Sequence, residues 1–209
     1  MTKTVSPLDF ESPEVYKGIL RSPFHWYAFA IAFKAAADKI AEHTVFLELR
    51  PPDSKPVTIQ DQYWTFAYMF LNGLALENVL KGLIVAADAN CVAIGEKEGE
   101  LKIRGIGHHN LDQLARRLEK EFKQYKLTFN DEEYKLLERL SGYVKEKGKY
   151  PVTKKFEPMF AGRLLKGKDP EIVGALWKRL SEVLGVIVLI VERQEAERNA
   201  LKAKRDRSE

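Results

Sequence analysis

Apolar segments with helical spacing alternate along the chain with short polar or glycine-containing interruptions. Residues 23–47 are rich in alanine and aromatic side chains, lack glycine, and stop before the proline pair at 51–52, which cannot continue a helix. Residues 60–87 are apolar on nearly every face, as expected of a helix surrounded by other helices. The pattern predicts two long helices, the second of them central. Gly73 and Gly82 within it predict close approach of a neighbouring helix.

Two later segments begin with residues that are typical of helix starts. Asn110 is followed three residues later by Gln113, as in a capping box, and this predicts a helix that runs to about Tyr125. Asn130 is followed by three acidic residues in the first turn, where negative charge suits the helix dipole. We expect the second of these helices to end near 147–148.

The last apolar segment follows Asp169-Pro170, which predicts a cap and a first-turn proline at the start of a long helix. Its apolar positions step by three and four residues, so we expect one buried stripe. From residue 192 onward six basic and five acidic residues are mixed, which is typical of a solvated helical tail. The expected stripe consists of Ile172, Leu176, Leu180, Val183, Ile187 and Ile190.

Together these elements predict an all-α fold, an up-and-down bundle of about five helices. We expect the bundle to span residues 23–191, with an N-terminal extension at 1–22 and the charged helical tail at 192–209. Between the predicted helices, residues 88–107 contain glycines and alternating charge, so we expect a loop or a small hairpin there. A chain of 209 residues with 45% hydrophobic content is ample for one core.

Cysteine content and hydropathy favour a cytoplasmic protein. The single cysteine, Cys91, excludes an internal disulfide and a cysteine-based zinc site, which is typical of a reducing compartment. The N-terminus has no apolar signal region, and the unbroken apolar runs, such as 186–191, are far shorter than the ~20 residues that span a bilayer. We therefore expect no membrane insertion.

Basic residues are concentrated in one part of the chain. The net charge of +4, from 34 basic and 30 acidic residues, is too even to indicate nucleic-acid binding by itself. Residues 144–168, however, hold eight basic and two acidic residues. A lysine-rich loop with one aromatic ring suits phosphate and base contact, although loop lysines are often simply solvated. The candidate ligand-binding residues are Lys145, Lys147, Lys149, Tyr150, Lys154 and Lys155.

The sequence GHHN at 107–110 contains two of the four histidines. At a helix start the partial positive charge of free N–H groups disfavours imidazolium, so His108 and His109 should tend to be neutral. A neutral imidazole can contact a ligand or act as a general base. Alternatively, one histidine packs against Leu114 and the other faces water. Adjacent side chains diverge and Asp112 is the nearest possible further ligand, so we expect no metal site, and no cofactor is indicated.

Glu77 and Lys81 are four residues apart on the predicted central helix, with the glutamate on the N-terminal side. This is the favoured orientation of an exposed helical ion pair. On a mostly apolar helix the pair can instead be buried, where both charges need partners. In that arrangement Lys81 is a candidate phosphate contact at the mouth of the bundle.

Aromatic residues are dense on the first two predicted helices. They exceed what a single face can bury, so they predict either a thick core or a homodimer interface, where aromatic residues concentrate. They are Phe24, Trp26, Tyr27, Phe29, Phe33, Tyr63, Trp64, Phe66, Tyr68 and Phe70.

Three short motifs, in this order and on these elements, resemble the HEPN domain, a helical nucleotide-binding family of higher eukaryotes and prokaryotes. The family's alanine-glutamate-x-x-leucine-lysine pattern on the second long helix is matched by residues 75–81. Its glycine-histidine-aspartate-leucine signature before the next helix is matched by residues 107–111, with Asn110 in place of aspartate. Its arginine-tyrosine-proline mark is matched by residues 149–151, with lysine in place of arginine. The resemblance covers roughly residues 24–191.

The resemblance implies a nucleotide- or RNA-binding module that forms a homodimer and works with a nucleotidyltransferase of the toxin–antitoxin type. Ribonucleolytic members carry an arginine and a histidine separated by four to six residues near the start of the last helix. This chain has no histidine after His109, and Arg104 with His109 is a pair of similar spacing at another place in the chain. The alternatives are a metal-independent ribonuclease that uses Arg104 and His109, and a dimeric helical scaffold.

Overall fold

The computed structural model describes residues 13–43, 58–94, 101–147 and 167–206. Within these ranges six α-helices and a two-stranded antiparallel hairpin form an all-α bundle, which confirms the predicted fold class. The expected hairpin within residues 88–107 is also present, with Val92 opposite Ile103. The helices are α1 (Pro13–Arg21), α2 (Pro23–Ala41), α3 (Ile59–Ala87), α4 (Leu111–Glu121), α5 (Asp131–Gly142) and α6 (Asp169–Arg205), and the strands are β1 (Val92–Ile94) and β2 (Leu101–Ile103).

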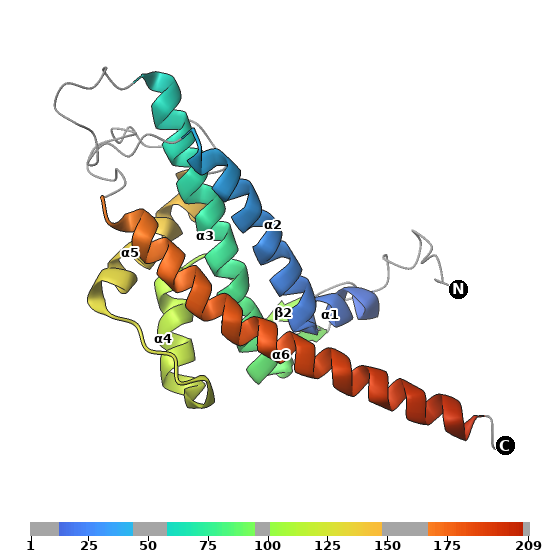
Figure 1. Cartoon of the computed structure of the whole chain (residues 1–209). Helices are drawn as coiled ribbons and strands as arrows, with labels where there is room; N and C mark the ends of the chain where they lie inside the picture. Colours follow the sequence, from blue (N-terminus) through green and yellow to red (C-terminus); the bar gives the residue numbers. More distant parts are fainter. Residues whose placement is uncertain (1–12, 44–57, 95–100, 148–166, 207–209) are drawn as a thin grey trace.

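The central position predicted for the second long helix is confirmed, because α3 contacts each of the other five α-helices of the described residues. Only the C-terminal part of α6, which extends beyond the bundle, lies away from α3. Figure 1 shows α2 along one side of α3, α4 and α5 on the other, and α6 crossing over them before extending past α1. Leu76, Leu80 and Leu83 on α3 are fully buried in this arrangement. Burial on all sides explains why α3 has no polar face.

Helix α1 lies within the segment expected to be an N-terminal extension. The Arg21 side chain donates a hydrogen bond from Nε to the Val92 carbonyl of β1 at 2.7 Å. The Trp26 indole on α2 donates to the Leu20 carbonyl at 2.8 Å. These bonds attach α1 to the hairpin and to α2. The described residues therefore contain one α-helix more than the five expected.

The predicted first long helix extends to residue 47, whereas α2 ends at Ala41. The His43 N–H bonds to the Ile40 carbonyl at 2.9 Å, a three-residue turn that is tighter than the α-helical bond. The close approaches predicted at the two glycines of α3 are confirmed. A Cβ at Gly73 would lie 2.6 Å from Val144 Cγ2, and one at Gly82 would lie 2.7 Å from Leu184 Cδ2.

The predicted caps have different outcomes. The capping box of α5 is confirmed, since the Asn130 side chain accepts from the Glu133 N–H and the Glu133 carboxylate accepts from the Asn130 N–H. The predicted side-chain cap at Asn110 is wrong. The Asn110 amide instead donates to Gln113 at 3.1 Å, and the first N–H of α4 donates to the hydroxyl of Ser141 on α5 at 2.8 Å.

The predicted cap at Asp169 is also wrong, because Asp169 is the first residue of α6 and Lys168 occupies the cap position. The Asp169 carboxylate is 1% exposed and forms an ion pair with Arg139 of α5. A carboxylate this deeply buried needs a cationic partner. The ion pair with Arg139 is therefore more favourable for Asp169 than a hydrogen bond to an N–H group of its own helix. Pro170 is in the first turn, as expected.

The buried stripe of α6 is only partly the predicted one. Leu176 and Leu180 are buried, but Ile172, Val183 and Ile187 are half-buried and Ile190 is 51% exposed. The segment is apolar on several faces, so spacing alone does not select one face, and the bundle no longer covers α6 beyond Val188. The residues that are buried are Val173, Leu176, Leu180, Leu184 and Val188.

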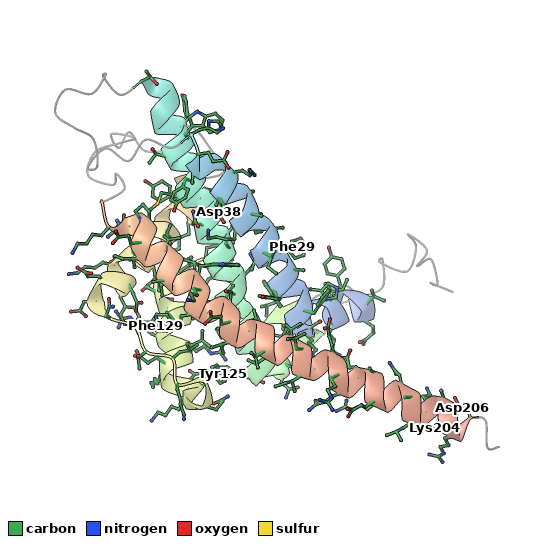
Figure 2. All side chains as sticks on the ribbon, viewed as in Figure 1. Phe29, Asp38, Tyr125, Phe129, Lys204 and Asp206 are labelled. Atoms are coloured by element: carbon green, nitrogen blue, oxygen red, sulfur yellow. The ribbon has the colours of Figure 1, made fainter. Side chains whose placement is uncertain are left out.

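The aromatic side chains of α2 and α3 divide between core and surface. Tyr68 is 4% exposed and belongs to the core, whereas Phe24, Phe29 and Tyr63 are 46–58% exposed. Figure 2 shows Phe29 on the outer side of α2. The others, Trp26, Tyr27, Phe33, Trp64, Phe66 and Phe70, are half-buried. The homodimer expected from these residues stays a prediction.

One helical stretch, Tyr63–Ala87 of α3, is long and apolar enough to cross a membrane by length and composition. In the bundle 72% of its apolar window is buried against other parts of the chain. A core helix has the same length and composition. The expected absence of membrane insertion therefore stays a prediction.

Candidate functional site

A buried ion pair lies at the centre of α3. Lys81 Nζ is 2.6 Å from Glu77 Oε1, and the two residues are 6% and 4% exposed. The Lys81 ammonium also lies 5.8 Å from the ring centre of Trp26, close enough for a cation–π contact. The exposed ion pair considered from the spacing is therefore wrong, and the buried alternative is the arrangement observed.

His109 reaches the same carboxylate from 32 residues away in sequence. Its Nδ1 is 3.0 Å from both Glu77 Oε1 and Glu77 Oε2. A carboxylate can only accept, so Nδ1 carries a proton and donates it to Glu77. In the neutral ring the outer nitrogen, Nε2, then keeps a free lone pair, and the side chain is 39% exposed. Glu77, Lys81 and His109 are hereafter called the Glu77 triad.

The segment between β2 and α4 places His109 against α3. Gly105 has φ of +69°, a conformation that glycine adopts without strain, and it turns the chain away from the hairpin. The next residue, Ile106, is 1% exposed and anchors the segment in the core. At the far end, the bond from the Leu111 N–H to Ser141 fixes the start of α4. The segment that carries the two histidines is therefore fixed at both of its ends.

His108 faces a different environment from its neighbour. Its Nδ1 accepts a hydrogen bond from the Asn110 N–H at 3.1 Å. The pKa of His108 is lowered from 6.5, first by burial and then by the positive charges of Lys81 and Lys145, against an opposing contribution from Glu77. The expected preference of His108 for the neutral form is confirmed. Burial is the largest cause of the lowered pKa. The sequence had instead suggested the partial positive charge at the start of the helix as the cause.

The lowered pKa of His108 makes the stability of the fold depend on pH. Below about pH 6.5 the unfolded chain binds a proton at this residue while the folded chain resists it, so the free energy of unfolding should fall as pH falls. We expect His108→Gln to lose less stability than the wild type between about pH 7.5 and about pH 5.5, measured by urea denaturation.

The control is Gln124→Asn, at an exposed residue whose side chain does not titrate, which should keep the wild-type pH dependence. A His108→Gln curve parallel to the wild-type curve over this range would contradict the buried, neutral assignment.

A hollow of about 420 Å³ lies between the start of α4 and the end of α5, and is hereafter called the α4–α5 hollow. The exposed Lys145, in the π-helical turn Tyr143–Lys147 that follows α5, lines it and acts electrostatically on His108. The hollow is next to the GHHN segment, because Asn110 of that segment also lines it. Its other lining residues are Asn110, Asp112, Gln113, Glu138, Arg139, Ser141 and Gly142.

Arg104 and His109 do not form a unit in the described part of the chain. Arg104 is exposed at the end of β2, where its N–H donates to the Cys91 carbonyl at 2.7 Å. Its carbonyl accepts from Arg117 at 3.2 Å, and no hydrogen bond joins its guanidinium to the His109 ring. The turn at Gly105 separates the two residues even though they are close in sequence.

Several predicted ligand-binding residues cannot be placed. Lys149, Tyr150, Lys154 and Lys155 lie outside the described residues, as does the side chain of Lys147. They stay predictions from the sequence.

Two residues of the site were missed by sequence reasoning. The Ser141 hydroxyl on α5 accepts a hydrogen bond from the first N–H of α4. In the sequence, Ser141 is marked only as a small polar residue beside the buried Leu140. The contact of Trp26 with Lys81 has no local signal, because it joins α2 to α3. Among the residues that the structure describes, no group of three or more His, Cys, Asp or Glu side chains could hold a metal ion.

Comparisons with known proteins identify no relative. No protein-family model matches the sequence, no curated protein matches it, and no solved structure matches the chain. The resemblance to the HEPN family stays a prediction from the three motifs.

Proposed function

We propose that this chain binds a nucleotide or RNA at the α4–α5 hollow, which Lys145 lines and which adjoins the segment that carries His108 and His109. The observation that supports this most is the convergence of these groups from separate elements. The triad joins the β2–α4 segment to α3, and the positive charge of Lys145, in the turn after α5, contributes to the lowered pKa of His108. The two motifs that resemble the HEPN family, at residues 75–81 and 107–111, therefore meet at the Glu77–His109 contact.

The chemistry of the hollow suits a ligand with both charged and neutral polar groups. Lys145 offers a positive charge for a phosphate. Asn110 and Gln113 can donate or accept hydrogen bonds, and the carboxylates of Asp112 and Glu138 can accept from ribose hydroxyls or base amino groups. The two carboxylates make the hollow a poor site for a bare anion. A nucleotide or an RNA segment carries both a phosphate for Lys145 and hydroxyl or amino groups that can donate to the two carboxylates.

Lys149, Tyr150, Lys154 and Lys155 extend the proposal on sequence grounds, as further phosphate contacts and a stacking ring. A homodimer is proposed from the aromatic residues of α2 and α3, and a nucleotidyltransferase partner from the HEPN resemblance alone.

The Glu77–His109 contact favours a second candidate, a metal-independent ribonuclease. With Nδ1 bound to Glu77, His109 Nε2 can take the proton of a ribose 2′-hydroxyl. The 2′-oxygen then attacks the adjacent phosphorus, the bond to the 5′-oxygen breaks, and that oxygen receives the proton. Arg104 is not placed to stabilise the transition state, so Lys145 would supply the positive charge.

The two candidates can be separated in one assay of the whole chain with fluorescein-labelled single-stranded RNA and EDTA, scored for mobility shift and for shortened product. Binding should weaken steeply between about 50 mM and about 200 mM salt. Lys145→Ala should weaken it by about tenfold, equivalent to one charge-assisted contact. Lys149→Ala and Lys154→Ala test the lysines placed by sequence alone.

Lys123→Ala is the matched control, because this exposed lysine lies in the turn after α4 and not at the hollow. It should bind as the wild type does. Product formation that disappears in His109→Ala would favour the ribonuclease. Neither shift nor product with RNA, and no binding of AMP by calorimetry, would overturn both candidates.

A further inference from the structure

The outward side of α6 exposes an apolar patch at the middle of the helix. Val186, Leu189 and Ile190 are 57%, 67% and 51% exposed, although the same turns bury Leu184 and Val188 against the bundle. In Figure 1 α6 lies across the bundle, and its C-terminal part continues beyond it. Figure 2 shows Lys204 and Asp206 at this distant end. Residues 192–206 are all exposed, so the described part of the chain does not cover them.

Charged residues flank this patch on the same side of the helix. Lys178 and Glu182 precede it, and Arg193 and Glu197 follow it; all four are exposed. The steps from Glu182 through the apolar patch to Arg193 are of four, three and four residues, the spacing of a coiled-coil seam. The outer seam of α6 is defined here as Lys178, Glu182, Val186, Leu189, Arg193 and Glu197.

We propose that the outer seam of α6 binds the same seam of a second copy in antiparallel orientation. A two-fold axis between Ile187 and Val188 places Val186 opposite Leu189 of the second copy. The same register places Glu182 opposite Arg193 of the second copy and Lys178 opposite Glu197 of the second copy. Each apolar side chain then meets an apolar one, and each charge meets its opposite.

The register continues to both ends of α6. Ala175 comes opposite Ala200 of the second copy, where small side chains let the helices approach, and Glu171 comes opposite Lys204 of the second copy. In a parallel pair the two copies of Glu182 would face each other, and so would those of Arg193. Like charges in that arrangement are destabilising, so the seam favours the antiparallel pair.

The antiparallel pair also explains the length of α6. The helix has 37 residues, about 55 Å at ~1.5 Å per residue, and its last turns leave the bundle. An isolated helical end without packing is marginally stable in water. In the pair, the free C-terminal turns of each copy lie on the N-terminal turns of the other. The interface differs from the one that the aromatic residues of α2 and α3 predict, and it does not rest on the proposed function.

Disulfide trapping tests the register directly. A chain carrying Lys178→Cys is mixed with a chain carrying Glu197→Cys and oxidised mildly. The mixture should give a disulfide-linked dimer, whereas either variant alone should give no more than the wild type, whose single Cys91 is buried. Strong cross-linking of Lys178→Cys alone would show a parallel pair and overturn the proposal.

Charge reversal tests the same register without cross-links. By sedimentation equilibrium the wild type should be a dimer, and Glu182→Arg or Arg193→Glu should each raise the dissociation constant at least tenfold. The double variant Glu182→Arg/Arg193→Glu should return to within about threefold of the wild type, because opposite charges face each other again. Glu195→Arg, on the other side of the tail, is the control and should leave the mass unchanged.

A monomeric wild type at about 100 μM, a range in which weak specific dimers still assemble, would overturn the proposal. A dimer that Trp64→Ala dissociates but the α6 variants do not would also overturn it, and would assign the interface to the aromatic residues. Circular dichroism of each variant establishes that α6 remains helical.

Discussion

Replacing Glu77 with alanine should lower the free energy of unfolding by about 3–5 kcal/mol. The substitution leaves the Lys81 ammonium buried at 6% exposure without its 2.6 Å partner, and it removes the acceptor of the His109 Nδ1 proton. Most of the lost stability comes from leaving the Lys81 charge buried without a partner. The loss of the attraction between the two charges contributes less. Urea denaturation followed by circular dichroism measures the loss.

The double variant Glu77→Leu/Lys81→Met is the control for this prediction. It removes both charges and keeps apolar volume in their place, so it should be within about 2 kcal/mol of the wild type. If Glu77→Ala alone loses less than about 1 kcal/mol, the pair is not buried in solution, and the Glu77 triad fails as a site.

Leu180→Ala should lower the free energy of unfolding by about 2–5 kcal/mol. Leu180 is fully buried on the inner side of α6, so truncation removes buried methyl groups and leaves a cavity in the core. The matched substitution Leu189→Ala, nine residues later on the same helix at 67% exposure, should change the stability of a single copy by less than about 0.5 kcal/mol.

The two leucine variants separate folding from association. Leu189→Ala should weaken the dimer proposed for the outer seam, and its effect on unfolding is therefore measured at a dilution where the wild type is monomeric. Equal losses of monomer stability in the two variants would mean that the bundle covers the outer side of α6 in solution.

Several elements of the fold could be predicted from the sequence because their causes are local. The capping box of Asn130 and Glu133 needs only residues three apart, and it forms as predicted. The apolar pattern of α3 indicates a central helix, and Gly73 and Gly82 mark the approaches of Val144 and Leu184. Each of these signals lies within one helix or one turn.

Other features depended on contacts between distant segments. Asn110 has the same local pattern as Asn130, but its side-chain amide donates to Gln113, and the first N–H of α4 donates to Ser141 of α5. Asp169 resembles a cap in sequence, yet it is buried beside Arg139. For Asp169 the tertiary fold offered a stronger partner than the local one.

The candidate site shows the same division. The sequence by itself determined that the chain is an all-α bundle and that Glu77, Lys81 and the two histidines belong to recognisable motifs. Only the tertiary structure decided that His109 binds Glu77, that burial and nearby positive charges lower the pKa of His108, and that no hydrogen bond joins the Arg104 side chain to His109. The physical reason is range: helical period and caps act over three to four residues, whereas burial and ion pairing depend on which segments the folded chain brings together.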